Sequence, residues 1–212
     1  MPTLAINNEA IAVIIIFRVE PDRQTELIET ISEFLETVKE QPGFISSSIH
    51  KSLDGIKVAN YAQWQSVEDY ETFLNNADVQ AKAAKLRTFS PPDAHTYEIV
   101  ISESKVGTPQ INKGEYFVHF AEFQMSPENQ PTMVELAKKH VKPAMKLPGL
   151  ISATFHRSLD GTRVMNYGQW RDEAAIEELR KQPGFGSESP YWEGIAENEF
   201  HLYEVLFTEP ET

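Results

Sequence analysis

The stretch Gln41-Pro-Gly-Phe-Ile-Ser-Ser-Ser-Ile-His-Lys-Ser-Leu-Asp-Gly-Ile-Lys-Val-Ala-Asn-Tyr-Ala-Gln-Trp64 occurs a second time as Leu147-Pro-Gly-Leu-Ile-Ser-Ala-Thr-Phe-His-Arg-Ser-Leu-Asp-Gly-Thr-Arg-Val-Met-Asn-Tyr-Gly-Gln-Trp170. His50 aligns with His156, which sets the offset between the copies at 106 (156 − 50). The same offset continues on both sides of this block without a gap. The chain is therefore a tandem duplication of one unit.

Each copy is expected to contain elements in the order strand, helix, strand, strand, helix, strand, judged from hydrophobic periodicity and turn residues. In the first copy they span 11–19, 23–40, two strands around Asp54-Gly55, 68–75 with a further helix 78–86, and 95–102. In the second copy, 116–125 and 132–146 are the first strand and helix. Pro143 should kink or shorten that helix because it lacks a backbone N–H. This order is that of the ferredoxin-like split βαβ sandwich, an α+β fold.

We assign residues 1–104 to the first repeat, 105–113 to a polar linker and 114–212 to the second repeat. A ferredoxin-like unit covers one face of its sheet with helices and leaves the other face in need of a partner. We therefore expect the two repeats to pack sheet to sheet as an intramolecular pseudo-dimer. Further assembly into a homo-oligomer stays open.

Composition narrows the classes of partner. The 212 residues include 19 Lys and Arg against 32 Asp and Glu, for a net charge of −13. Such a field repels phosphate backbones and anionic lipid, so no nucleic-acid or membrane partner is expected. There is no cysteine, and the longest apolar run, 10–17, is too short to span a bilayer. We expect a cytoplasmic protein that binds a neutral or aromatic small molecule.

The loop length of the first hairpin decides which side chains share a face of the sheet, because a shift of one residue moves every side chain to the opposite face. A three-residue loop Leu53-Asp54-Gly55, with the glycine in a left-handed conformation, pairs His50 with Val58. His50, Asn60 and Trp64 then lie on one face. A two-residue loop would separate His50 from Asn60.

On the favoured register the face is too polar for a plain core and is typical of a small-molecule pocket. Asn60 is suited to hydrogen-bond an oxygen, and Trp64 offers a flat apolar wall. A helix that begins near Ser66 would fold Tyr70 over them. The second repeat offers the pocket residues His156, Asn166 and Trp170. The alternative is structural: a histidine on a strand is commonly a core residue, and a tryptophan at a strand end commonly fills the core.

Other chemistry finds little support in the sequence. No glycine-rich phosphate loop, nucleophile elbow or HExxH motif is present, so nucleotide-dependent, hydrolase and zinc-protease functions lack their usual motifs. The six histidines would bind a metal only if the fold gathered them, and we predict no metal site.

The pattern Pro42-Gly43-Phe44 … His50-x-Ser52-x-Asp54-Gly55 … Asn60-Tyr61-Ala62-Gln63-Trp64-x-Ser66 … Tyr70 resembles the signature of the antibiotic biosynthesis monooxygenase domain. The resemblance covers both copies almost end to end. It implies the dimeric α/β-barrel fold, here formed within one chain by the two ferredoxin-like units. The best-known enzymes of that family oxidise polycyclic phenols to quinones with molecular oxygen and without flavin, haem or metal.

The resemblance also implies roles for individual residues. Asn60 and Trp64 would hold the substrate and the reduced oxygen, while His50 and Tyr70 would assist proton movements. Arg87 is an approximate match to an arginine of the family pattern. The expected function is that of a cofactor-independent monooxygenase that uses O2 to oxidise an aromatic polyketide or quinol-type substrate.

Two other functions remain open at this point: a non-catalytic protein of the same fold that binds such a compound, and a purely structural or stress-related duplicate. The family also contains haem-degrading enzymes. That activity is less favoured because no histidine is placed as an axial ligand, and His140 is not at the matching position.

We expect any activity to reside mainly in the first repeat. At the offset of 106, Tyr70 becomes Ile176, which has no hydroxyl to give or take a proton. The segments 81–90 and 184–193 also differ, since the second contains two glycines and a proline where the first is rich in alanine. The second pocket should therefore have a different lid.

Overall fold

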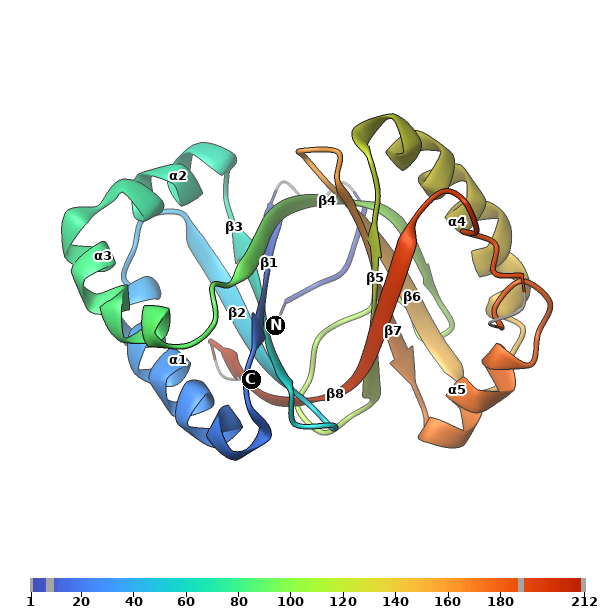
Figure 1. Cartoon of the computed structure of the whole chain (residues 1–212), viewed down its shortest axis with the longest axis horizontal. Helices are drawn as coiled ribbons and strands as arrows, with labels where there is room; N and C mark the ends of the chain where they lie inside the picture. Colours follow the sequence, from blue (N-terminus) through green and yellow to red (C-terminus); the bar gives the residue numbers. More distant parts are fainter. Residues whose placement is uncertain (1, 7–9, 187–188, 211–212) are drawn as a thin grey trace.

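The computed structural model describes residues 2–6, 10–186 and 189–210. Its centre is a barrel of strands, with helices packed on two opposite sides (Figure 1). The elements of the first repeat are β1 (Ile11–Arg18), η1 (Pro21–Arg23), α1 (Gln24–Val38), β2 (Phe44–Ser52), β3 (Lys57–Trp64), α2 (Val67–Asn75), α3 (Ala77–Lys82), η2 (Ala83–Thr88) and β4 (Asp93–Ser104). Those of the second repeat are β5 (Phe117–Gln124), η3 (Pro127–Asn129), α4 (Gln130–Ala144), β6 (Leu150–Ser158), β7 (Arg163–Trp170), α5 (Glu173–Arg180) and β8 (Glu197–Glu209).

The barrel closes in the strand order β1-β3-β2-β8-β5-β7-β6-β4. Every pairing is antiparallel, and each repeat contributes four consecutive strands. The repeats join where β4 pairs with β6 and where β8 pairs with β2. The expected pair of ferredoxin-like units forming an intramolecular α/β barrel is thus confirmed. The edge strands of each sheet are hydrogen-bonded to the other repeat, so closure leaves neither sheet with a free edge.

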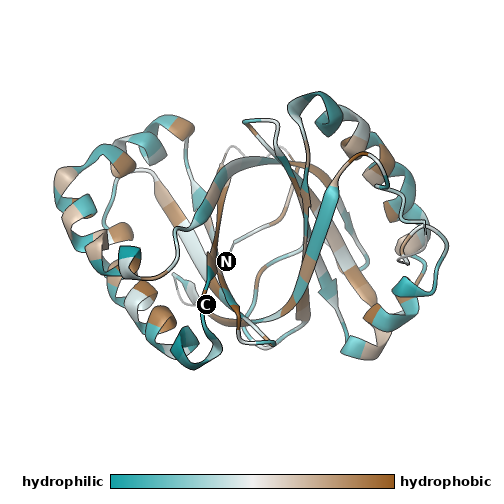
Figure 2. Cartoon of the chain, viewed as in Figure 1, coloured by the Kyte–Doolittle hydropathy of each residue, from teal (hydrophilic) through white to brown (hydrophobic). Residues whose placement is uncertain are grey.

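Large aromatic and aliphatic side chains from both repeats fill the barrel. Tyr61, Phe120, Tyr167 and Tyr203 are each fully buried there. Outside the barrel, α1 and α4 turn their apolar faces toward the strands, and the helices alternate hydrophilic and hydrophobic residues along their length (Figure 2). Helix α4 ends at Ala144, directly after Pro143 and two residues before the expected end.

The predicted register of the first hairpin is wrong. Four residues, 53–56, separate β2 from β3, and His50 pairs with Ala59 while Asn60 pairs with Ile49. His50 and Asn60 therefore lie on opposite faces of the sheet. The longer loop is stabilised because Ser52 Oγ accepts a hydrogen bond from the backbone N–H of Lys57 at 2.9 Å.

Gly55 adopts the expected left-handed conformation, with φ of 83°. Asp54 Oδ1 accepts a hydrogen bond from the backbone N–H of Ile56 at 3.2 Å, which closes an Asx turn inside the same loop. The second hairpin has the same register, since Phe155 pairs with Asn166 and His156 with Met165.

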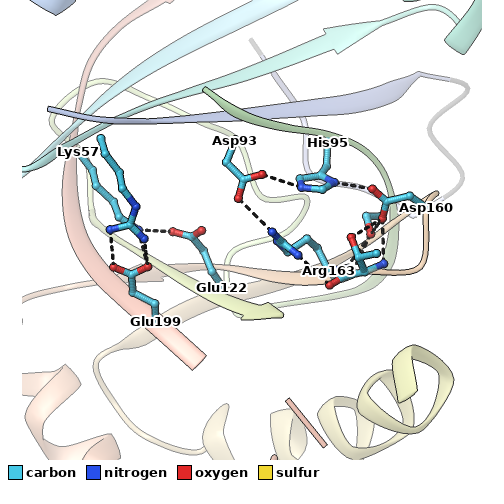
Figure 3. A network of polar contacts seen from close by, with 10 residues as sticks. Lys57, Asp93, His95, Glu122, Asp160, Arg163 and Glu199 are labelled. Carbon is cyan, nitrogen blue, oxygen red and sulfur yellow. Dashed lines mark hydrogen bonds and ion pairs between the residues drawn. The ribbon is translucent and has the colours of Figure 1, made fainter. Parts of the chain in front are cut away.

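A polar network joins the two repeats at one end of the barrel (Figure 3). The ammonium of Lys57 is fully buried and lies 2.8 Å from Glu122 and 3.1 Å from Glu199. At the equivalent position of the other repeat, Arg163 lies 3.3 Å from Asp93. Each of these ion pairs crosses between repeats. Among the described residues, no helix is long and apolar enough to cross a membrane.

Candidate functional site

The first repeat holds a cavity of about 460 Å³ between the outer face of β1 and β3 and the surrounding helices. Its walls are mainly aliphatic and aromatic, and its polar lining residues are Asn60, Tyr70, Gln80 and Arg87. A mostly apolar cavity with a few convergent polar groups is the usual form of a small-molecule site. The predicted residues Asn60, Trp64 and Tyr70 all line it.

Asn60 is held in one orientation by a neighbouring strand. Ser47 Oγ donates a hydrogen bond to Asn60 Oδ1 at 2.6 Å. Ser47 is fully buried on β2, and its hydroxyl engages the amide oxygen of Asn60. No described side chain accepts a hydrogen bond from the amide N–H groups of Asn60. The fixed amide therefore offers hydrogen-bond donors to a molecule in the cavity.

Trp64 and Tyr70 form an aromatic wall. Trp64 ends β3, and its ring centroid lies 5.5 Å from that of Tyr70 and 4.9 Å from that of Phe73. Helix α2 carries Tyr70, and it begins after Ser66, whose hydroxyl accepts a hydrogen bond from the N–H of Asp69 at 3.0 Å. Burial raises the pKa of Tyr70 to about 12, so its hydroxyl stays protonated at neutral pH and remains a donor.

Arg87 brings a positive charge to this cavity. It lies on η2, and its guanidinium donates a hydrogen bond to the side-chain carbonyl of Gln80 on α3. Both side chains line the cavity. The sequence pattern matched Arg87 only approximately, and the structure places it beside Asn60, Trp64 and Tyr70 in the lining.

His50 does not join these residues, and the expectation that all four converge on one cavity is wrong. Its side chain lies inside the barrel, with Nε2 2.9 Å from the hydroxyl of Tyr167 and Nδ1 3.0 Å from the carbonyl of Ser48. Burial lowers the pKa of His50 to about 4, against the backbone hydrogen bonds that raise it. The neutral ring links the first repeat to a tyrosine of the second.

His156 repeats this arrangement and is likewise absent from the second cavity. Its Nε2 lies 2.9 Å from the hydroxyl of Tyr61, inside the barrel. Burial lowers its pKa to about 4 as well. The physical reason for both misplacements is the even number of residues in each hairpin loop, which puts the histidine and the asparagine on opposite faces.

The second repeat has its own cavity, of about 950 Å³, and Asn166 and Trp170 line it as predicted. Ile176 occupies the position of Tyr70, and His119 on β5 also lines this cavity. Sequence reasoning missed His119. The available signal was the offset of 106, which aligns His119 with Val13, so a titratable ring replaces an aliphatic residue on an outward-facing strand position.

An eight-stranded barrel built from two ferredoxin-like halves, with a cavity beside the helices of each half, is the dimeric α/β-barrel fold formed within a single polypeptide. The chain belongs to the antibiotic biosynthesis monooxygenase family, whose model matches residues 10–85 and 116–187. The matches fall once in each repeat.

Two known proteins illustrate the similarity. Tetracenomycin-F1 monooxygenase from Streptomyces glaucescens is 31% identical over 93 residues, which are 43% of this chain and 83% of that protein. A crystal structure of an anthrone oxidase-like protein superimposes with a TM-score of 0.87 at 20% identity, over 98% of this chain and 95% of the other. The second comparison shows that the whole duplicated barrel is shared.

Proposed function

We propose that the protein is a cofactor-independent monooxygenase that oxidises a polycyclic hydroxylated aromatic compound, of the aromatic polyketide or quinol type, with O2 in the cavity of the first repeat. The observation that carries the proposal is the amide of Asn60, fixed by Ser47 and adjoining the aromatic wall of Trp64 and Tyr70 in an apolar cavity. The relative named tetracenomycin-F1 monooxygenase supports the same reaction class.

The chemistry needs an electron-rich substrate and an oriented oxygen. Loss of the phenolic proton makes the aromatic ring able to give electrons to O2, and a bond forms between a ring carbon and oxygen. The resulting hydroperoxide loses the hydrogen on that carbon as its O–O bond breaks. The carbon becomes a carbonyl, and the second oxygen atom leaves as water, so one O2 yields one quinone oxygen and one water.

The residues of the first cavity suit the charge changes in this sequence. The N–H groups of Asn60 are donors for the negative charge that develops on oxygen, and a donor fixed in advance needs no reorganisation during the reaction. Tyr70 lines the cavity and its hydroxyl is protonated, so in this proposal it gives a proton to the leaving oxygen. Arg87 favours the ionised form of a phenol in the cavity.

Differences between the repeats support activity mainly in the first. Ala153 stands where the first repeat has Ser47, so Asn166 has no serine to fix its amide. Ile176 stands where the first repeat has Tyr70, which removes the proton donor. The second cavity therefore retains the asparagine and the tryptophan, but it lacks the serine that orients the amide and the tyrosine that would supply a proton.

The test is oxygen uptake above the uncatalysed rate with 1,8-dihydroxy-9-anthrone, using protein dialysed against a chelator and without added flavin. Asn60→Ala should lower kcat/KM by about a hundredfold, the typical effect of losing one such donor. Asn166→Ala is the matched control and should leave most of the turnover. Equal loss from both variants would contradict the assignment to the first repeat. Saturable binding of the anthrone without catalysed uptake would favour a non-catalytic binding protein instead.

A further inference from the structure

The outer faces of the two long helices carry opposite charges at equivalent positions. At the offset of 106, three glutamates of the first repeat align with three lysines of the second: Glu33 with Lys139, Glu36 with Lys142 and Glu40 with Lys146. All six side chains are exposed to solvent. Within each set the residues are three and four apart, so they form a stripe along one helical face. Two equivalent surfaces of the duplicated fold are therefore complementary in charge.

The three lysines are not neutralised within the chain. They form no ion pair in the described structure, whereas the neighbouring Lys138 lies 2.7 Å from Glu135. The whole chain is acidic, with a net charge of −13. A stripe of unpaired cations on an acidic molecule is a surface that attracts a negatively charged partner.

The glutamate stripe remains open to a further cation. Glu33 lies 3.1 Å from Lys85, and Glu36 lies 2.8 Å from Lys39, yet these glutamate side chains are 68% and 67% exposed. Glu40 has no ion pair within the described part of the chain. A carboxylate accepts several hydrogen bonds. Each of these groups can therefore bind a lysine of another molecule.

The two stripes cannot meet within one molecule, because α1 and α4 lie on opposite outer sides of the barrel (Figure 1). Their backbones are closely alike. Both helices have 15 residues, and each continues into a turn closed by an equivalent hydrogen bond, from Lys39 N to Leu35 O at 2.9 Å and from Met145 N to Val141 O at 2.8 Å. At 1.5 Å per residue, each stripe is about 10 Å long. The stripes therefore match in length as well as in charge.

We propose that the outer face of α4 binds the outer face of α1 of a second copy of this chain. The helices lie antiparallel, with Glu36 opposite Lys142 at the centre. The remaining charges then match in two further pairs: Glu33 with Lys146, and Glu40 with Lys139. Contact of α1 with α1 would place carboxylates against carboxylates, and contact of α4 with α4 would place ammonium groups together. Only the mixed contact is favourable.

This contact is head to tail. When α4 of one copy binds α1 of the next, the first copy keeps a free α1 and the second keeps a free α4. Association therefore extends as a chain of copies instead of stopping at a dimer. The inner faces of α1 and α4 line the first and the second cavity, so each contact places the two kinds of cavity near one another. The inference does not depend on the proposed reaction.

The association is weak and depends on salt. Exposed ion pairs each contribute little, so we expect a dissociation constant of about 0.1 to 1 mM. At an ionic strength of about 0.1 M the screening length is about 10 Å, which reduces repulsion between the two net charges but preserves attraction between facing side chains. At about 1 M the screening length is about 3 Å, and the association should be lost.

Sedimentation equilibrium of the full chain tests the contact. In about 0.1 M salt the weight-average mass should rise steadily above that of the monomer as the concentration approaches about 1 mM, and in about 1 M salt it should return to the monomer value. Lys142→Glu should weaken the association by about threefold or more, because it replaces the central attraction by repulsion. Lys113→Glu makes the same charge change outside both helices and should alter the association by less than about twofold.

Two triple variants reverse one stripe each. The acidic variant carries three changes on the second repeat: Lys139→Glu, Lys142→Glu and Lys146→Glu. The basic variant carries three on the first: Glu33→Lys, Glu36→Lys and Glu40→Lys. Their net charges are −19 (−13 − 6) and −7 (−13 + 6). Each variant alone should have an association constant lower than that of the parent by about tenfold or more, because both of its stripes then have the same sign.

An equal mixture of the two variants should regain association to within about threefold of the parent, since each acidic stripe again meets a basic one. This recovery also shows that both variants are folded. The proposal is overturned if the parent stays monomeric up to about 1 mM, if its association persists in about 1 M salt, or if the mixture associates no more than its components. It is also overturned if the basic variant, with its smaller net charge, associates as strongly as the parent. A monomeric parent that binds poly-glutamate through Lys142 would assign the lysines to a different acidic partner and exclude self-association.

Discussion

Asn60 and Asn166 occupy the same place in the two copies, yet they offer different atoms to their cavities. In the first repeat the hydroxyl of Ser47 occupies the amide oxygen and leaves the N–H groups as donors. In the second repeat Ala153 makes no such contact, and Asn166 Oδ1 has no partner in the described structure. The hydroxyl of Ser47 therefore accounts for the difference between the two amides. It orients Asn60 as a donor, whereas no serine orients Asn166.

Ser47→Ala should lower kcat for the proposed reaction by roughly threefold to tenfold, because the net contribution of one hydrogen bond is about 1 kcal/mol. Ser47 acts by positioning Asn60, so KM should change little. Ser47→Thr keeps the hydroxyl and should restore most of the rate. Ala153→Ser is the reciprocal control and should leave the rate of the first site unaltered. An unchanged kcat for Ser47→Ala would show that the amide needs no such support.

The pattern of residue types located Asn60, Trp64 and Tyr70 correctly in one cavity. It misplaced His50 because the face of a strand residue depends on loop length, and the hydrogen bonds of Ser52 and Asp54 that set this length form only in the folded loop. His119 was missed for another reason. A single histidine in an apolar strand has no motif, and only the fold shows that it lines the second cavity.

At the scale of elements, the β2–β3 hairpin fixes which side chains reach the cavity and which enter the barrel. Its turn depends on Gly55, whose φ of 83° is unfavourable for residues with a Cβ. A Cβ at Gly55 would also lie 3.3 Å from the side chain of Pro21, at the start of η1. The hairpin is thus packed directly against the beginning of the first helical segment.

Gly55→Ala should lower the free energy of unfolding by about 1 to 2 kcal/mol, the cost of placing an L-residue in the left-handed region, with a further penalty from the contact with Pro21. Gly107→Ala is a matched control, because Gly107 has φ of 88° and nothing within 4 Å of its Cβ position. Urea denaturation of both variants measures the difference. An equal or larger loss for Gly107→Ala would contradict the importance of the contact with Pro21.

The helices and strands themselves followed closely from periodicity. The strand expected at 11–19 is observed as β1, Ile11–Arg18, and the helix expected at 68–75 is observed as α2, Val67–Asn75. These elements have regular hydrophobic spacing and clear boundary residues, such as the Ser66 cap. The pairing of β4 with β6 and of β8 with β2 was not specified by the sequence pattern, since many residues separate the strands in each pair.

At the scale of the whole molecule, buried histidines make stability depend on pH. His50 and His156 connect the two repeats inside the barrel, and burial lowers the pKa of each to about 4. The pKa of His119 is lowered to the same value. In the unfolded chain a histidine has a pKa of about 6.5. Between pH 6.5 and 4 the unfolded state therefore binds protons that the folded state excludes.

The free energy of unfolding should fall on acidification from pH 6.5 toward pH 4, by up to about 1.4 kcal/mol per pH unit for each such histidine. Below about pH 4.5 the carboxylate of Glu199 adds to the loss. Burial acts to raise its pKa, but hydrogen bonds from Arg18, His201 and Lys57 outweigh it and lower the pKa to about 2. Its contribution is present above pH 4.5 and disappears as the pH falls toward 2.

Urea denaturation at pH 7, 6 and 5 tests the histidine contribution. His50→Gln removes one of the titrating groups and keeps a polar side chain for Tyr167, so its stability should decline less steeply with acidification than that of the parent. Equal free energies of unfolding at pH 7 and pH 5 for the parent protein would contradict the prediction.

The pairing of β8 with both β2 and β5 also has a consequence during translation. All other described strands leave the ribosome before β8. Until β8 is synthesised, the edges of β2 and β5 that pair with it have no partner strand. Those edges are available to neighbouring polypeptides for as long as synthesis lasts, which makes the growing chain a natural client for chaperones that shield strand edges. Ribosomes stalled just before residue 197 should carry a nascent chain that is sensitive to protease in both repeats, whereas a single polypeptide extended past residue 209 should acquire resistance in both repeats together.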